Sequence, residues 1–205
     1  MSENNTFTTY RQQLRERIVE TAMSAFASQG IRAVKMDDIA RQICISKRTL
    51  YELYENKESL LFEVVRFFHS NRERRMVELV QHGKNAIDIV LEAYRQRLEE
   101  LRGISPLFYD DLKKYPRVLK FLEENKEKNS QRFVDFLHRG VAEGYFRSDL
   151  DYNLVPLMFD AIGRYIMIRE LYRQYDMELV FRSLVFTSLR GICTEMGAKA
   201  LDKGI

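Results

Sequence analysis

Three consecutive side chains, Lys47, Arg48 and Thr49, form a basic, hydrogen-bonding group directly after Ser46. Ser46 is a good helix N-cap, because its hydroxyl accepts a bond from a backbone N–H that has no partner within the helix. The three side chains therefore belong to the exposed first turn of a helix. Such a turn fits the major groove of DNA, and Arg48 has the geometry for two bonds to a guanine edge. A solvated helix face is the alternative interpretation of the same residues.

The elements that would position this turn lie within residues 37–61. The pattern predicts two short helices joined by a tight turn, followed by the start of a third helix. The small side chain of Ala40 would let the two helices cross closely. The apolar residues expected to point inward are Ile39, Ile43, Ile45, Leu50 and Leu53. This arrangement is a helix-turn-helix.

Residues 10–61 resemble the DNA-binding domain of the tetracycline-repressor (TetR) family of bacterial transcription regulators. The resemblance covers about a quarter of the chain. It implies that Tyr51 contacts a DNA phosphate, whereas Tyr54 packs inside the domain. The matching residues are Phe26, Gly30, Ile31, Ile39, Ala40, Ile45, Ser46, Thr49, Leu50, Tyr51, Tyr54, Lys57, Leu60 and Leu61.

The chain departs from the family pattern at three positions. Lys35 stands where a Thr commonly caps the helix, which leaves that cap to Asp37 or to solvent. Cys44 occupies the usual turn Gly, so a side chain stands where a left-handed backbone is expected. Cys44 could be a redox switch, but a small buried residue is the favoured interpretation. Tyr54 replaces the usual Phe.

Lys57 is expected at the N-terminus of the fourth helix, where backbone N–H groups and the helix dipole attract a phosphate. The full set of expected DNA contacts is Lys35, Lys47, Arg48, Thr49, Tyr51 and Lys57.

The composition is helical, with 9 Gly and 3 Pro in 205 residues. The net charge is +3, and residues 1–50 already hold eight Lys and Arg against five Asp and Glu. The basic excess therefore lies in the segment that resembles a DNA-binding domain. Two cysteines are too few for a disulfide framework. Asp160, Arg164 and Arg169 interrupt the most apolar helix, so a cytoplasmic protein is expected.

Hydrophobic periodicity predicts an all-α fold. The resemblance implies an N-terminal helix-turn-helix domain and a C-terminal helical bundle for ligand binding and dimerisation. The domains are expected at residues 1–56, with an N-terminal arm, and 57–205. Outside the motif, helices are expected at about 10–28, 57–80, 85–102, 107–114, 116–143, 153–173 and 177–200.

The last two expected helices carry apolar residues on more than one face, and both faces must be buried. The resemblance implies that they pack against the same pair of another subunit as a four-helix dimer interface. Intramolecular core is the alternative. The candidate interface residues are Leu157, Tyr165, Leu184, Ser188 and Gly191.

The C-terminal part is rich in aromatic residues, most of which must be packed core. The resemblance implies a ligand pocket among them, and an aromatic lining favours an apolar or aromatic small-molecule effector. The candidate pocket residues are Phe67, Tyr94, Phe108, Phe133 and Phe159.

No catalytic motif is recognisable, and no metal site or cofactor is expected. The adjacent pairs Asp110–Asp111 and Glu123–Glu124 are interpreted as solvated surface. The favoured function is a ligand-responsive repressor that binds a palindromic operator as a homodimer. The alternatives are a helical scaffold protein without specific DNA recognition and a helical-bundle enzyme.

Overall fold

A computed structural model describes the backbone of residues 2–204 and the side chains of residues 10–204. The fold is all-α, as predicted, and no strand occurs within the described range apart from one isolated β-bridge. The chain forms two compact units. Unit 1 comprises residues 1–72 and 103–121, and unit 2 comprises residues 73–102 and 122–205. The domain boundary expected after residue 56 stays a prediction.

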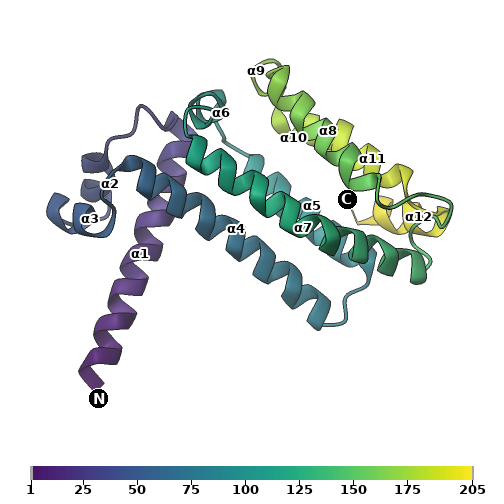
Figure 1. The fold of residues 1–205 in the computed structure, drawn as a ribbon, viewed down its shortest axis with the longest axis horizontal. Coiled ribbons are helices and arrows are strands. Elements are labelled where there is room, and N and C mark those ends of the chain that lie inside the picture. The colour runs from purple at the N-terminus through teal and green to yellow at the C-terminus, as the bar shows by residue number, and fades with distance from the viewer. Residues whose placement is uncertain (1, 205) are drawn as a thin grey trace. The chain divides into compact units, whose positions relative to one another are not determined.

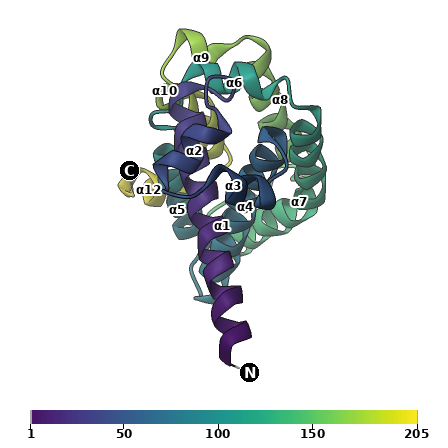
Figure 2. The ribbon, with the colours of Figure 1, turned by 90° about the vertical axis from the view of Figure 1, so that its left-hand side faces the viewer.

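Unit 1 holds the N-terminal helices and a helical segment from the middle of the chain (Figure 1). Its elements are α1 (Ser2–Gln29), α2 (Met36–Gln42), α3 (Lys47–Leu53), the first part of α4 (Lys57–Gln81), α6 (Pro106–Leu112) and the start of α7 (Pro116–Ala142). Helix α1 begins earlier than the expected residue 10. Helix α2 packs against both α1 and α3 (Figures 1 and 2).

The core of unit 1 follows the helical spacing of its apolar residues. On α1, Leu14, Ile18, Ala22 and Phe26 recur on one face and are all buried. Leu50 on α3 is also fully buried. This packing holds α2 and α3 as the expected helix-turn-helix.

Unit 2 holds the ends of α4 and α7 together with the remaining helices. Its own elements are α5 (Ala86–Leu101), α8 (Val155–Ile168), α9 (Leu171–Gln174), α10 (Met177–Val180), the π-helix η1 (Phe181–Phe186), α11 (Thr187–Gly191) and α12 (Glu195–Lys203). Helix α5 supplies one wall of the hydrophobic core through Val90, Tyr94 and Leu98, and it packs against α10 and α12.

The helices expected at 153–173 and 177–200 each end earlier than predicted. The first stops near residue 169, whereas α10, η1 and α11 continue one another from residue 177 to 191 before the chain breaks at 192–194. The first helix stops at Arg169, because Glu170 adopts a left-handed backbone with φ of 50°. Asp176 then starts α10 by accepting bonds from two backbone N–H groups. Near the end of the chain, Thr194 starts α12, because its hydroxyl accepts a bond from the N–H of Gly197.

Two glycines allow the segment 144–147 to lie close against its neighbours. A Cβ on Gly140 would lie 2.1 Å from Cδ2 of Phe146, and a Cβ on Gly197 would lie 2.1 Å from the carbonyl oxygen of Tyr145. In the same region, Phe146 and Cys193 form the isolated β-bridge. The close packing therefore depends on the absence of side chains at Gly140 and Gly197.

Candidate nucleic-acid interface

The first turn of α3 is built as the sequence predicts. The hydroxyl of Ser46 accepts a bond from the backbone N–H of Thr49 at 3.0 Å, which caps the helix. The two hydroxyls of Ser46 and Thr49 lie 2.8 Å apart and share a hydrogen bond. Behind the turn, Leu50 is buried, so the side chains of Lys47 and Arg48 are directed to solvent.

Both cations of this turn have carboxylate partners within unit 1. Lys47 pairs with Asp37 of α2, and Nε of Arg48 donates to Glu52 at 2.8 Å. The bond to Glu52 raises the pKa of Arg48 above its ordinary value. The Arg48 side chain is 88% exposed and that of Lys47 67%, so water screens both pairs. A DNA phosphate or base edge could replace these carboxylates at small cost.

The other expected DNA contacts differ in exposure. Tyr51 is 48% exposed on α3, whereas Tyr54 is buried, as the resemblance implied. Lys35 is exposed at the N-cap of α2, and its side chain makes no cap bond. Instead, the carboxylate of Asp38 accepts a bond from the Lys35 backbone N–H at 3.3 Å. Lys35 and Tyr51 are thus accessible, and their DNA contacts stay predictions.

The turn between α2 and α3 contains a strained residue. Cys44 has a φ of 59°, which is the left-handed region that the family's glycine at this position suggested. Its thiol is exposed, so the prediction that Cys44 is buried is wrong. The exposed Cys44 lies between Ile43, which is buried, and Ile45, which is half-buried.

Lys57 has a structural role that the sequence pattern did not reveal. Its ammonium donates to the carbonyl oxygens of Ile31 at 2.9 Å, Arg32 at 3.1 Å and Val34 at 2.9 Å. Partial burial lowers the pKa of Lys57, although Asp111 opposes this shift. The lysine thereby fixes the loop between α1 and α2 to the start of α4. A phosphate contact by Lys57 stays a prediction.

Asp111 of α6 holds the same loop from the other side. Its Oδ2 atom accepts a bond from the backbone N–H of Arg32 at 2.8 Å, and Oδ1 pairs with Lys114 at 3.2 Å. Only 7% of Asp111 is exposed, so its interpretation as solvated surface is wrong. A carboxylate that completes a loop hydrogen bond from 79 residues away leaves no periodic signal in the sequence.

The five expected pocket residues fall in both units. In unit 1, the ring of Phe67 packs on Phe68 and that of Phe108 on Tyr109. In unit 2, the structure brings three of them to one hydrophobic cluster: Tyr94, Phe133 and Phe159. The pocket assignment as a whole stays a prediction.

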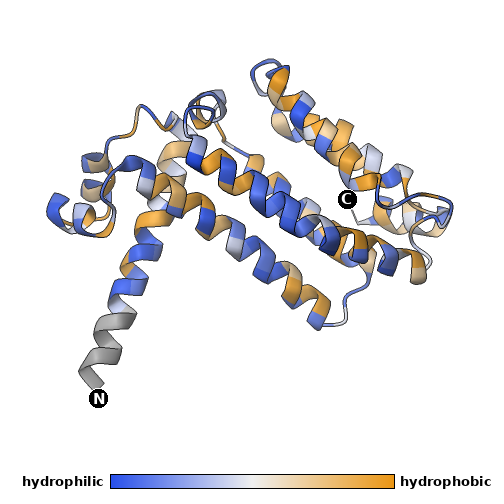
Figure 3. Ribbon diagram, viewed as in Figure 1, coloured by the Kyte–Doolittle hydropathy of each residue, from blue (hydrophilic) through white to orange (hydrophobic). Residues whose placement is uncertain are grey.

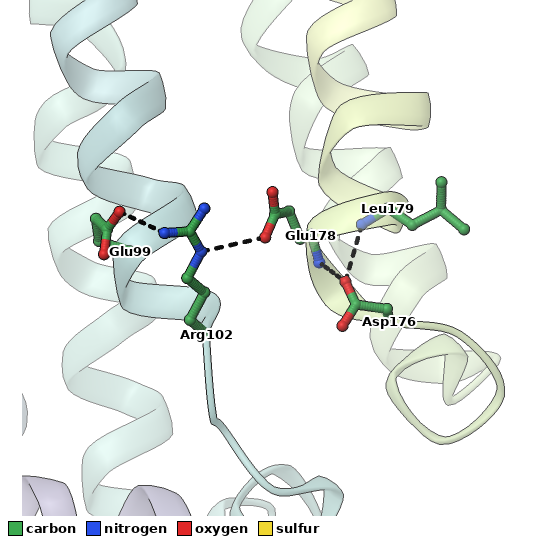
Figure 4. A network of polar contacts seen from close by, with 5 residues as sticks. All are labelled: Glu99, Arg102, Asp176, Glu178 and Leu179. Carbon is green, nitrogen blue, oxygen red and sulfur yellow. Dashed lines mark hydrogen bonds and ion pairs between the residues drawn. The ribbon is translucent and has the colours of Figure 1, made fainter.

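A shallow hollow on the surface of unit 2 involves none of the expected pocket residues. Asp176, Glu178, Leu179 and Arg182 line it. Figure 4 shows Arg102 pairing with Glu178 on one side and with Glu99 on the other. These polar contacts tie the end of α5 to α10.

The expected dimer residues are accessible within the single chain. Tyr165 is 55% exposed, Leu184 and Ser188 are half-buried, and added atoms at Gly191 would meet open space. Most of α8 is hydrophobic (Figure 3). Its exposed apolar side chains recur at helical spacing on one face: Leu154, Leu157, Met158, Tyr165 and Ile168. We refer to these five residues as the α8 stripe.

The described residues contain neither a metal-binding cluster nor a membrane-spanning helix. Among the side chains of residues 10–204, no three His, Cys, Asp or Glu residues are grouped so that they could hold a metal ion. No described helix has the length and apolar character to cross a membrane.

Comparison with known sequences gives one family. The model described as "Bacterial regulatory proteins, tetR family" matches residues 18–64, which include α2 and α3. The HTH-type transcriptional repressor KstR2 of Mycobacterium tuberculosis is 30% identical over 147 residues, which cover 69% of this chain and 73% of the relative. KstR2 of Mycolicibacterium smegmatis is 27% identical over 146 residues, covering 69% of this chain and 71% of that one.

Solved structures agree with this result. The ketosteroid transcriptional regulator KstR2 of Mycobacterium tuberculosis is 25% identical, with a TM-score of 0.56 over 88% of this chain and 95% of its own. A putative transcriptional regulator from Saccharomonospora viridis, solved in complex with choline, is 19% identical. Its TM-score is 0.67 over 90% of this chain and 100% of its own, which supports the fold.

Proposed function

The chain belongs to the TetR family of bacterial transcriptional regulators, and we propose that it represses transcription by binding a palindromic operator as a homodimer. The exposed basic first turn of α3 carries this proposal. Lys47, Arg48 and Thr49 stand on a capped helix whose opposite face is buried, which is the arrangement of a helix that reads the major groove. Such a protein works in the cytoplasm, where it meets DNA.

The α8 stripe supports the dimeric part of the proposal. A contiguous exposed apolar surface on a helix usually marks a protein partner. A second copy of the chain is the partner that a palindromic operator requires, because the two-fold symmetry of the DNA mirrors that of the protein. Leu157 and Tyr165 would lie in this interface, with Leu184, Ser188 and Gly191 beside them.

A small molecule is the proposed signal for release from DNA. The relatives include a ketosteroid transcriptional regulator and a regulator solved with choline. In this chain, the aromatic cluster around Tyr94, Phe133 and Phe159 favours an apolar, ring-containing effector. A role as a catalyst is not proposed, because its relatives are regulators.

Selection of bound fragments from genomic DNA tests the proposal, followed by titration of the best fragment. Arg48→Ala should cost about 1–3 kcal/mol on that fragment and relax the preference at one base pair in each half-site. It should scarcely change binding to unrelated DNA. Arg147→Ala is the matched control, since Arg147 is an exposed arginine of unit 2 that also pairs with a carboxylate, Asp149.

The outcomes separate the alternatives. Equal losses on specific and unrelated DNA would make Arg48 a phosphate contact rather than a reading residue. Recovery of no preferred fragment would favour the helical scaffold protein without specific DNA recognition.

A further inference from the structure

The hydroxyl of Tyr94 is a buried polar group without a hydrogen-bond partner in the part of the chain whose side chains are described. Tyr94 lies on α5 in the core of unit 2, and only 5% of it is exposed. Buried hydroxyl groups in folded proteins nearly always have a partner. Tyr54 in unit 1 also has a buried hydroxyl without a partner in the described part of the chain, so this property alone does not mark a ligand site. The segment that surrounds Tyr94 distinguishes it.

The segment that faces Tyr94 is a π-helical turn. The rings of Phe181 and Phe186, at the two ends of η1, lie 5.7 Å and 4.8 Å from the Tyr94 ring between centroids. Single π-helical turns are rare and occur frequently at functional sites. The unpaired hydroxyl and the irregular turn are independent observations, and both occur in the same aromatic group.

The surroundings define the chemistry of the missing partner. Phe181 stacks on Tyr94, with 21° between the rings, and Phe186 is tilted against it by 49°. Phe133 and Phe159 pack against the same hydrophobic cluster. Aromatic walls favour a flat apolar ring, while the phenolic O–H can donate one hydrogen bond.

We propose that Tyr94 and the π-turn η1 form an effector subsite for an apolar, ring-containing molecule with a carbonyl oxygen. The carbonyl oxygen of this molecule accepts a hydrogen bond from the Tyr94 hydroxyl. The ring of the molecule packs against Phe181, Phe186 and their neighbours. This inference rests on the proposed function, because it specifies the effector of that regulator. The turn also carries Leu184, so a ligand at Tyr94 acts on a helix that holds a proposed dimer residue.

The test uses the full chain and two probes that differ in one group. 1-Tetralone is a fused-ring ketone, and tetralin is the same ring system without the carbonyl. Tyr94→Phe removes only the hydroxyl and should lower the affinity for 1-tetralone roughly 3- to 10-fold, as expected for one hydrogen bond. The affinity for tetralin should not change. Isothermal titration calorimetry measures both.

Tyr54→Phe is the matched control. Tyr54 is also a buried tyrosine whose hydroxyl has no hydrogen-bond partner in the described part of the chain, but it belongs to unit 1. This variant should bind 1-tetralone as the wild type does. An equal loss in Tyr54→Phe would overturn the subsite. So would an equal loss for tetralin in Tyr94→Phe, or failure of 1-tetralone to bind the wild type.

A spectroscopic measurement on the wild type is independent of any variant. The carbonyl stretch of bound, carbonyl-¹³C-labelled 1-tetralone should shift to lower frequency than in a hydrocarbon solvent, and Tyr94→Phe should abolish the shift. An unshifted band in the wild type would overturn the proposal. Titration of the selected operator fragment with the same samples distinguishes failure of the subsite proposal from failure of the proposed regulator function. Intact operator binding without ketone binding refutes only the subsite, whereas absent operator binding refutes the regulator.

Discussion

At the scale of single residues, the candidate reading group is held in place by the chain's own carboxylates. Lys47 and Arg48 pair with Asp37 and Glu52 in the absence of DNA. Exposed pairs of this kind contribute little to stability, because water screens them. The carboxylates therefore orient the two cations without competing strongly with a nucleic acid.

Cys44 offers a direct test of backbone strain at this scale. Its left-handed φ of 59° brings the Cβ atom too close to the backbone, while its exposed thiol packs against no core. Cys44→Gly should raise the free energy of unfolding by a few tenths to about 1 kcal/mol. Urea titration measures the change. Cys44→Ala keeps the Cβ atom and should give no such gain; equal stabilisation by both variants would assign the effect to the thiol.

The raised pKa of Tyr54 leads us to expect that the stability of the fold depends on pH in the alkaline range. Burial raises the pKa of Tyr54 to about 12, and the carboxylate of Glu63 adds to the rise. Below about pH 10 the phenol is neutral in both states, but between about pH 10 and 12 only the unfolded chain loses the proton. Stability should therefore fall across this window, by about 1–3 kcal/mol from Tyr54.

Urea titrations between about pH 8 and 11.5 check this expectation. Tyr54→Phe should flatten the alkaline loss relative to the wild type, because a phenylalanine side chain cannot ionise. Tyr115 and Tyr152, whose pKa values burial also raises, remain in both proteins and cancel in the comparison. Identical slopes would show that Tyr54 ionises equally in the folded and unfolded states.

At the scale of elements, the sequence predicts helices well where caps and periodicity agree. Asn85 and Ser105 cap α5 and α6 at the expected starts, and the side chain of Asn56 accepts a bond from the N–H of Ser59 near the start of α4. The end of the chain was predicted as two long helices, because its apolar pattern runs on without Gly or Pro at residue 170. Glu170 is not a residue type that favours a left-handed backbone, so no local pattern predicts the turn there.

The sequence predicts the residues of the candidate DNA-reading turn, but it does not predict all the residues that hold the domain around that turn in place. Ser46 and the turn after it could be identified, because capping and exposure are local properties. Asp111 and the three carbonyl partners of Lys57 could not, since these bonds join distant segments of the chain. The π-turn beside Tyr94 was also missed, because a π-helix has no composition of its own.

Lys57 tests the link between α4 and the preceding loop. Lys57→Met keeps the apolar stem but removes the donor to three carbonyl oxygens, so the free energy of unfolding should fall by about 1–3 kcal/mol. Lys199→Met, at an exposed lysine in α12, should change it by less than about 0.5 kcal/mol.

DNA titrations of the folded Lys57→Met variant at several salt concentrations separate the two possible roles. A phosphate contact by Lys57 would reduce the slope of log affinity against log salt by about one. An unchanged slope, together with lower stability, would leave Lys57 with the structural role alone.

At the scale of the whole molecule, the proposed function requires two helix-turn-helix heads. Two heads meet successive major grooves only if the half-sites lie about one helical turn apart, roughly 34–36 Å, or a multiple of it. A single head would lose half of its specific contacts. The oligomeric state should therefore control operator affinity.

Leu157→Glu tests this dependence without disturbing the fold. Leu157 is 61% exposed within one chain, so a carboxylate is tolerated there in a monomer. In the proposed dimer the same carboxylate would be buried without a partner, at a cost of several kcal/mol. Light scattering should show monomers, and a parallel titration should show a collapse of operator affinity.

Val77→Glu is the control for an added charge outside the α8 stripe. Val77 lies on α4 and is 52% exposed. This variant should keep the wild-type mass and affinity. A Leu157→Glu protein that stays dimeric would place the interface elsewhere, and a monomer with full affinity would refute the two-headed mechanism.

The close packing around residues 144–147 also constrains how related chains can evolve. At Gly197 the obstacle to a side chain is the backbone oxygen of Tyr145, which no substitution removes. At Gly140 the obstacle is the ring of Phe146, which a smaller residue would relieve. Descendants that keep this fold should therefore retain Gly197 unconditionally. Gly140 is free to mutate only in lineages where position 146 has first lost its aromatic ring, so the order of the two substitutions is fixed.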